Sequence, residues 1–121
     1  MNLYQASCEL AGRPAEPLQP AEVSERARVG SDAACRHAIE LFFGFLGTVA
    51  GNLALTLGAR GGVYVAGGIV VQLGDMLTRS TFRERSEAKG RYRAYLERIP
   101  TSLILDASAL ALRGANAALD A

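Results

Sequence analysis

A short run of β-branched and aromatic residues between two glycine pairs constrains this chain more than any other segment. Residues 61–70 read Gly-Gly-Val-Tyr-Val-Ala-Gly-Gly-Ile-Val. A short apolar run bounded by glycines predicts a buried strand of a parallel sheet. Gly67 and Gly68 would then lie at the carboxyl end of that strand, where open α/β sheets bind ligands and where glycine lets a flat ligand approach the backbone. A tight strand-to-helix turn without a ligand explains the same glycines equally well.

Size and composition limit the chain to one domain or a piece of one. It has 121 residues, half of them hydrophobic, and a formal net charge of +1. A net charge this close to zero produces no overall electrostatic attraction to nucleic acid or an anionic membrane. Cys8 and Cys35 fit no metal or redox spacing, so reduced thiols in a cytoplasmic protein are the simplest interpretation. No basic segment followed by an apolar one opens the chain, so no secretory signal is predicted.

The rest of the pattern predicts mostly helix and one further strand. Helices are expected over residues 2–11, 20–28, 33–57, 71–78, 82–97 (interrupted near Gly90) and about 107–119. Pro20 suits the first turn of the second helix, Ser31 or Asp32 can cap the start of the third, and Gly58 suits its C-terminal cap. Strands are expected at about 62–66 and 101–105. Because helices connect the two strands, they should be parallel, with a right-handed crossover. Two strands are too few for a stable sheet, so the chain looks like part of a larger one.

A long uncharged segment raises a membrane-spanning alternative. No charged residue occurs from Leu41 to Ala59, and a membrane span needs about 20 such residues. Gly47 and Gly51 could bring two membrane helices together. However, the segment also contains Asn52 and two threonines, and no Trp or Tyr marks an interface beside it. We therefore favour a buried helix of an α/β protein, whose glycines let it lie close to the sheet.

Two further features could carry chemistry. His37 is the only histidine and has no serine or carboxylate at a recognisable spacing, so we interpret it as a solvent or packing residue. Residues 79–98 hold seven basic side chains and two tyrosines, which could contact phosphates and stack bases. A solvated helix face is the favoured explanation, and we expect no nucleic-acid partner. No Cys/His cluster and no P-loop occur in the sequence, so neither structural zinc nor a P-loop cradle is predicted.

Several motifs together carry a family resemblance. They are Gly-Asn-Leu-Ala-Leu-Thr-Leu-Gly-Ala-Arg-Gly-Gly-Val-Tyr-Val-Ala-Gly-Gly-Ile over 51–69, Ser-Thr-Phe-Arg-Glu-Arg over 80–85, Glu-Ala-Lys-Gly-Arg over 87–91 and Arg-Ile-Pro-Thr over 98–101. With these motifs the chain closely resembles the C-terminal portion of bacterial ATP-dependent glucokinase. The resemblance covers nearly the whole sequence.

The resemblance implies a sugar kinase of the actin and hexokinase superfamily, in which two ribonuclease H-like domains close over glucose and Mg-ATP. The expected fold class is α/β: an incomplete ribonuclease H-like (actin-like ATPase) domain, mostly helical, with two short parallel strands. Residues 1–121 would be the C-terminal part of the large domain, ending in a hinge-crossing helix at about 107–119. The residues expected to face the adenosine of ATP are Gly62, Ala66, Gly67, Gly68 and Ile69.

The resemblance assigns this chain no catalytic residue and no Mg²⁺ ligand. In the family, the phosphate loops, the catalytic aspartate and the sugar-binding groups all precede the segment that is matched here. Phosphoryl transfer depends on positioning and electrostatic clamping, so we expect this chain alone to be inactive. A non-catalytic nucleotide-binding or interaction module, and a small membrane protein built on 41–59, are the alternative hypotheses. Missing partner strands would leave an exposed sheet edge, which favours pairing with another copy.

Overall fold

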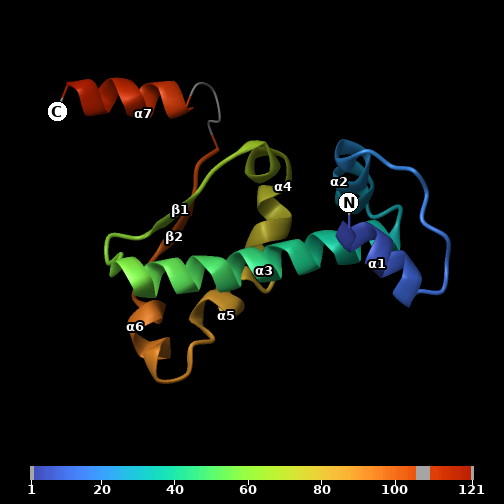
Figure 1. Ribbon diagram of the computed structural model, residues 1–121, viewed down its shortest axis with the longest axis horizontal. Helices are drawn as coiled ribbons and strands as arrows, with labels where there is room; N and C mark the ends of the chain where they lie inside the picture. The colour runs from blue at the N-terminus through green and yellow to red at the C-terminus, as the bar shows by residue number, and fades with distance from the viewer. Residues whose placement is uncertain (1, 106–109, 121) are drawn as a thin grey trace.

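The computed structural model describes residues 2–105 and 110–120. A long central helix, α3, runs through the middle of the fold, and the other elements are arranged around it (Figure 1). In chain order the elements are α1 (Asn2–Leu10), α2 (Pro20–Val29), α3 (Ala33–Leu57), β1 (Val63–Val65), α4 (Gly68–Thr78), α5 (Phe82–Glu87), the 3₁₀ helix η1 (Gly90–Tyr92), α6 (Arg93–Glu97), β2 (Thr101–Leu103) and α7 (Leu110–Leu119).

Local capping signals fix both ends of α3 where the sequence predicts them. The side chain of Asp32 accepts hydrogen bonds from the amides of Ala34 (2.9 Å) and Cys35 (3.3 Å). These bonds satisfy two of the amides that the first turn of a helix leaves without an intrahelical partner. Gly58 ends the helix in the left-handed conformation, with φ 61°, which glycine adopts without a steric penalty.

The glycines of α3 lie against α5, and the expectation that they bring the helix close to the sheet is wrong. A Cβ added at Gly47 would lie 2.9 Å from both Cα and the carbonyl carbon of Phe82, and closer still to the carbonyl oxygen. A Cβ at Gly51 would lie 3.0 Å from the carbonyl carbon of Ser86. Glycine at these two positions therefore lets the backbones of two helices approach more closely than any side chain would permit.

One face of α3 stays uncovered by the described residues. By length and composition alone the helix could cross a membrane, and 44% of its most apolar window is buried. Helices α1, α2 and α5 pack against it, which supports the interpretation of a core helix for the faces that they cover. Four large apolar side chains are nevertheless at least half exposed: Phe45, Val49, Leu53 and Leu57. A continuous apolar stripe of this kind marks a surface that normally has a partner.

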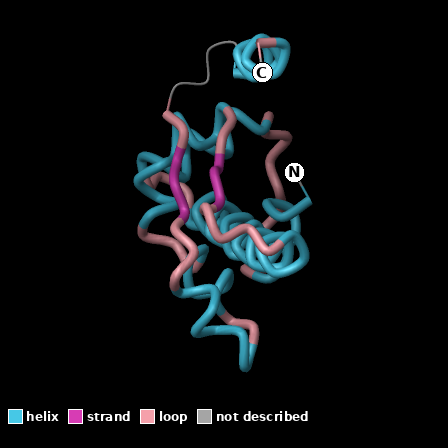
Figure 2. Tube along the Cα trace, turned by 90° about the vertical axis from the view of Figure 1, so that its left-hand side faces the viewer, coloured by secondary structure: helices cyan, strands magenta, loops and turns pink. Residues whose placement is uncertain are grey.

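The two strands form a parallel pair, as predicted, with Val63 opposite Thr101 and Val65 opposite Leu103. Figure 2 shows them side by side, with helices packed around them. Both strands are shorter than the predicted spans of 62–66 and 101–105. The last bond of the ladder runs from the amide of Ile104 to the carbonyl of Val65 (2.9 Å). Beyond it, the chain following β1 turns into α4.

The predicted start of α4 needs correction, whereas the predicted interruption of a later helix is confirmed. Helix α4 begins at Gly68, three residues before the predicted start at 71, because the carbonyl of Gly67 already accepts hydrogen bonds from the amides of Val70 and Val71. The helix predicted over 82–97 with an interruption near Gly90 is present as α5, η1 and α6, and Gly90, with φ 56°, lies at the interruption as expected. The final helix is present as α7, while the predicted residues 107–109 lie outside the described residues.

The hydrophobic core is built around the N-terminal half of α3. Its largest fully buried side chains include Tyr4, Phe43, Val70 and Leu73, so α1, α3 and α4 all contribute to it. Helix α7 stands apart from this core (Figure 1), and its residues 111–119 are exposed.

Candidate functional site

Four of the five predicted site residues gather where β1 turns into α4. Ala66, Gly67 and Gly68 are exposed, and Ile69 is half-buried. Gly67 precedes the helix with φ 122°, a conformation that L side chains rarely adopt. A Cβ added at Gly67 or Gly68 would meet no atom within 4 Å. The turn therefore presents bare, accessible backbone at the carboxyl end of a parallel strand.

Gly62, the fifth predicted residue, lies at the opposite end of β1 and has a structural explanation of its own. Its φ is 122°, and a Cβ there would lie 3.1 Å from the carbonyl oxygen of Pro100. The amide of Val63 donates to the same oxygen at 2.8 Å. The close approach of the two strand starts is by itself enough to explain glycine at this position.

The chemistry available at the β1–α4 turn is that of backbone and apolar surface. The first amides of α4 lack intrahelical partners, and a helix N-terminus favours negative charge. No titratable side chain belongs to residues 66–70. Among the described residues, no group of three or more His, Cys, Asp or Glu could hold a metal ion. The turn exposes open backbone, and the side chains of residues 66–70 supply no acid, base or carboxylate.

The structure gives His37 a partner that the sequence did not indicate. The hydroxyl of Ser7 lies 3.1 Å from Nδ1 of His37. Ser7 is buried and His37 is exposed, so the imidazole satisfies a buried hydroxyl at the α1–α3 contact. No bond between His37 and a carboxylate is recorded within the described residues. We interpret the pair as structural, and the 30 residues between its members explain why spacing could not reveal it.

Arg83 shows that the basic segment is not simply a solvated face. Its guanidinium donates to the carbonyls of Ile99 (2.7 Å), Leu96 (3.1 Å) and Glu97 (3.0 Å), and to the hydroxyl of Thr101 (3.2 Å). The carbonyls at the C-terminal end of α6 thereby gain the partners that a helix end lacks. The solvated-face interpretation is wrong for Arg83, which holds α5, α6 and the start of β2 together.

Two partly exposed arginines surround the buried carboxylate of Asp32 at the junction of α1, α2 and α3. Arg13 pairs with Asp32 at 2.9 Å, and Arg26 approaches the same carboxylate at 3.7 Å. The bond from Arg13, reinforced by backbone amides, lowers the pKa of Asp32. Burial, reinforced by the nearby Asp32 carboxylate, raises the pKa of Cys35 to about 11. Cys8 and Cys35 are both free and buried, so neither is suited to act as a nucleophile.

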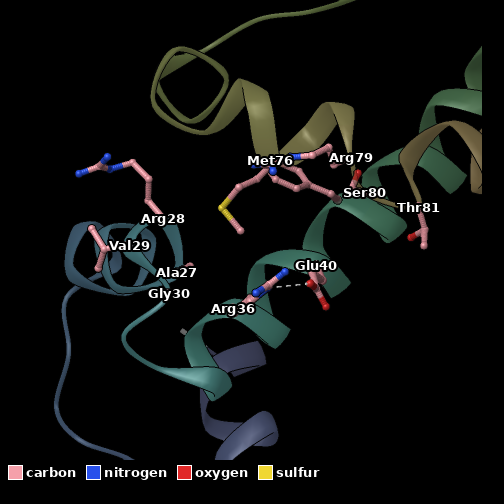
Figure 3. Close-up of a pocket in the computed structure, with 11 residues that line it drawn as sticks. Ala27, Arg28, Val29, Gly30, Arg36, Glu40, Met76, Arg79, Ser80 and Thr81 are labelled. Atoms are coloured by element: carbon pink, nitrogen blue, oxygen red, sulfur yellow. Dashed lines mark hydrogen bonds and ion pairs between the residues drawn. The ribbon is translucent and has the colours of Figure 1, made fainter.

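A cavity of about 550 Å³ opens between α2, α3 and α4 (Figure 3), and sequence reasoning did not find it. We call it the three-helix cavity. It is lined by Ala27, Arg28, Val29, Gly30, Arg36, Glu40, Phe43, Met76, Arg79, Ser80 and Thr81. These residues come from the end of α2, the first half of α3, and the end of α4 with the turn that follows. No local motif could have predicted a cavity whose lining comes from three elements.

Comparison with known proteins decides the family. The profile of the family described as Glucokinase matches residues 1–121. This chain belongs to the glucokinase family. The glucokinase of Nitrobacter hamburgensis is 52% identical over 120 residues, which cover 99% of this chain and 38% of that protein. The glucokinase of Chromobacterium violaceum is 55% identical over 105 residues, which cover 87% of this chain and 30% of that protein.

A solved glucokinase has the same arrangement of elements. The crystal structure of glucokinase from an Antarctic psychrotroph matches with a TM-score of 0.85 and 34% identity, over 98% of this chain and 36% of that one. The mostly helical architecture with two parallel strands is therefore that of a part of glucokinase. This chain spans between 30% and 38% of the length of these relatives.

Proposed function

We propose that this chain is the C-terminal part of the large domain of an ATP-dependent glucokinase and supplies the adenosine side of its nucleotide site. The intact enzyme would transfer the γ-phosphoryl group of ATP to the 6-hydroxyl of glucose in the cytoplasm. The observation that carries the proposal is the bare turn between β1 and α4, in a chain of the glucokinase family.

The turn fits adenosine by shape and does not fit Mg²⁺. Gly67 and Gly68 leave open space where a Cβ would stand, so a planar base can lie against their peptide planes. Half-buried Ile69 adds an apolar edge. Mg²⁺ requires carboxylate or phosphate oxygens, and residues 66–70 contain no carboxylate. When bound, Mg-ATP supplies the phosphoryl group, and this chain's share is to bind and orient the nucleoside.

Three uncovered surfaces support the view that the domain continues beyond this chain. Within residues 2–105 and 110–120, each strand of the two-stranded sheet is paired on one side only, and an isolated pair of strands is marginal in water. The apolar stripe of α3 that includes Phe45 and Leu57 is exposed, and so are Leu112 and Leu119 of α7. A relative of which the matched segment is only 38% contains ample further chain to cover them. We further propose that α7 crosses the hinge toward the second domain.

The same free strand edges favour association between copies of this chain when the rest of the domain is absent. Unpaired backbone amides and carbonyls along an edge are a template for another strand. Sedimentation of the isolated chain, before and after addition of a complementary fragment from a relative, measures this tendency. We expect the oligomers to dissociate when the complementary fragment binds.

A chimaeric enzyme tests the proposed adenosine contact. The segment of the Nitrobacter hamburgensis glucokinase that this chain matches is replaced by this chain, and Gly68→Val is introduced. Because the valine side chain would occupy the space proposed for the base, KM for ATP should rise at least tenfold while KM for glucose stays unchanged. Gly61→Val is the matched control, since a Cβ at Gly61 also meets open space but lies at the other end of β1. Equal effects of the two variants on KM for ATP would contradict the proposal.

A further inference from the structure

The three-helix cavity carries an excess of positive charge that the proposed nucleotide contact does not use. Three arginines and one glutamate line it. Arg28 is turned to Glu25 on its own helix, with which it forms two hydrogen bonds. Arg36 from α3 and Arg79, the residue that follows α4, therefore remain as the cationic groups on opposite walls (Figure 3).

Neither arginine is strongly committed to a partner. Arg36 pairs with Glu40 one turn along α3 at 3.2 Å, and the two side chains are 64% and 53% exposed. Exposed pairs of this kind contribute little to stability. Arg79 donates through Nε to the carbonyl of Asp75 at 3.3 Å. Within the described residues, no bond is recorded for its two terminal nitrogens, which are the donors that grip phosphate or carboxylate oxygens in a bidentate manner.

The rest of the lining suits a ligand with a carbon body. Buried Phe43 and Ala27, with half-buried Met76, form the apolar part of the wall. The exposed hydroxyl of Thr81 lies at the rim, whereas that of Ser80 already donates to the carbonyl of Leu77 at 2.6 Å. A volume of about 550 Å³ falls within the range of small-molecule sites and exceeds the needs of a bare inorganic anion.

The cavity is separate from the β1–α4 turn. Met76 lies in the last turn of α4 and Arg79 directly follows the helix, while Gly67 and Gly68 lie at its start. Eleven residues of helix put about 16 Å between the two ends. Leu73, with φ −122° and ψ 20°, interrupts the helix between them.

We propose that the three-helix cavity binds a small phosphate monoester. Its dianion lies between Arg36 and Arg79, and its carbon body lies against Phe43 and Met76. Binding displaces Glu40 from Arg36, because the phosphate competes for the same donors. The carboxylate of Glu40 thus acts as an internal competitor, and its removal should strengthen binding.

The test is an NMR titration of the full chain with phenyl phosphate at pH 7.5, where the ester is a dianion. We expect saturable shifts at the amides of Gly30, Phe43 and Thr81. Phenol and inorganic phosphate should each bind at least tenfold more weakly, because phenol has no phosphate group for the arginines and inorganic phosphate has no carbon body for the apolar wall. Shifts confined to Gly67 and Gly68 would instead indicate anion binding at the start of α4 and would overturn the proposal.

Substitutions at three exposed residues are expected to weaken, tighten and leave unchanged the binding of phenyl phosphate. Arg79→Gln should weaken binding of phenyl phosphate at least tenfold, and Glu40→Gln should tighten it several-fold. Arg93→Gln, on an exposed arginine of α6 outside the cavity, should leave it unchanged. Equal weakening by Arg79→Gln and Arg93→Gln, or no effect of Glu40→Gln, would identify diffuse attraction to surface arginines and overturn the proposal. Calorimetry on the chimaeric enzyme repeats the measurement within a complete glucokinase, where absence of binding would also overturn it.

Discussion

Replacing Gly47 with alanine tests the close backbone contact between α3 and α5. The added Cβ would lie 2.9 Å from two backbone atoms of Phe82 and closer to its carbonyl oxygen. Backbone atoms cannot rotate away as a flexible side chain can, so the two helices would have to separate by roughly 1 Å. A gap of that size forfeits between a quarter and a half of each dispersion contact along the interface.

The expected cost follows from two opposing effects. Alanine in the interior of a helix is about 1 kcal/mol more favourable than glycine. Overpacking of a well-packed contact costs about 1–3 kcal/mol, and occasionally more. The clash at Gly47 involves main-chain atoms of a helix whose Phe82 side chain is itself buried. We therefore place the cost of overpacking at the upper end of this range. The net loss in the free energy of unfolding should be about 2 kcal/mol.

Gly44 offers a matched control on the same helix. A Cβ there would meet Oγ1 of Thr81 at 3.0 Å, a side-chain atom that can move aside. Gly44→Ala has the same gain in helix propensity without the backbone clash, so it should lie within about 1 kcal/mol of the parent chain. Urea unfolding followed by circular dichroism measures both variants. Equal stabilities of Gly44→Ala and Gly47→Ala would show that the backbone contact with Phe82 does not set the cost of a side chain at Gly47.

Three further predictions concern the polar groups of the fold. Arg83→Gln should lower the free energy of unfolding by about 2 kcal/mol in urea, because several carbonyls lose a charged donor, whereas Arg93→Gln should lower it by less than about 0.5 kcal/mol. The bond from Arg13 lowers the pKa of Asp32 in the folded state. The contribution of this bond to the free energy of unfolding is therefore complete above the unfolded pKa of Asp32, near 4, and is lost as pH falls through the folded pKa. Asp32→Asn should therefore be less stable than the parent at pH 7 and should show a shallower loss of stability below pH 4; a parallel pH profile would contradict this. Because burial raises the pKa of Cys35 to about 11, its thiol should react with a disulfide reagent at pH 8 only after the chain unfolds, and rapid reaction in the native state would contradict its burial.

Local signals predicted most of the N-terminal half of the fold. Pro20 begins α2, and Asp32 and Gly58 cap α3, because proline geometry, side-chain acceptors and left-handed glycine act within a few residues of their own position. The parallel pairing of β1 and β2 followed from their helical connection. These features depend on short-range stereochemistry, which a single sequence carries.

The features that were missed depend on partners distant in sequence. The spacing of Gly47 and Gly51 indicates which face of α3 is small, but only the packed structure shows that α5 covers it. Arg83 reaches carbonyls 13 to 16 residues away, and its role could not be separated from that of its basic neighbours by composition. The three-helix cavity is likewise formed by side chains from helices whose mutual packing no periodicity specifies.

An assay of glucose phosphorylation, followed through the release of ADP, compares two preparations. One is this chain alone. The other is the chimaera in which this chain replaces the matching segment of the Nitrobacter hamburgensis glucokinase, which spans 38% of that protein. We predict no turnover by the chain alone and glucose-dependent turnover by the chimaera. Turnover by the chain alone, or a folded chimaera that binds glucose without phosphorylating it, would contradict the assignment of this chain to the adenosine side of the enzyme.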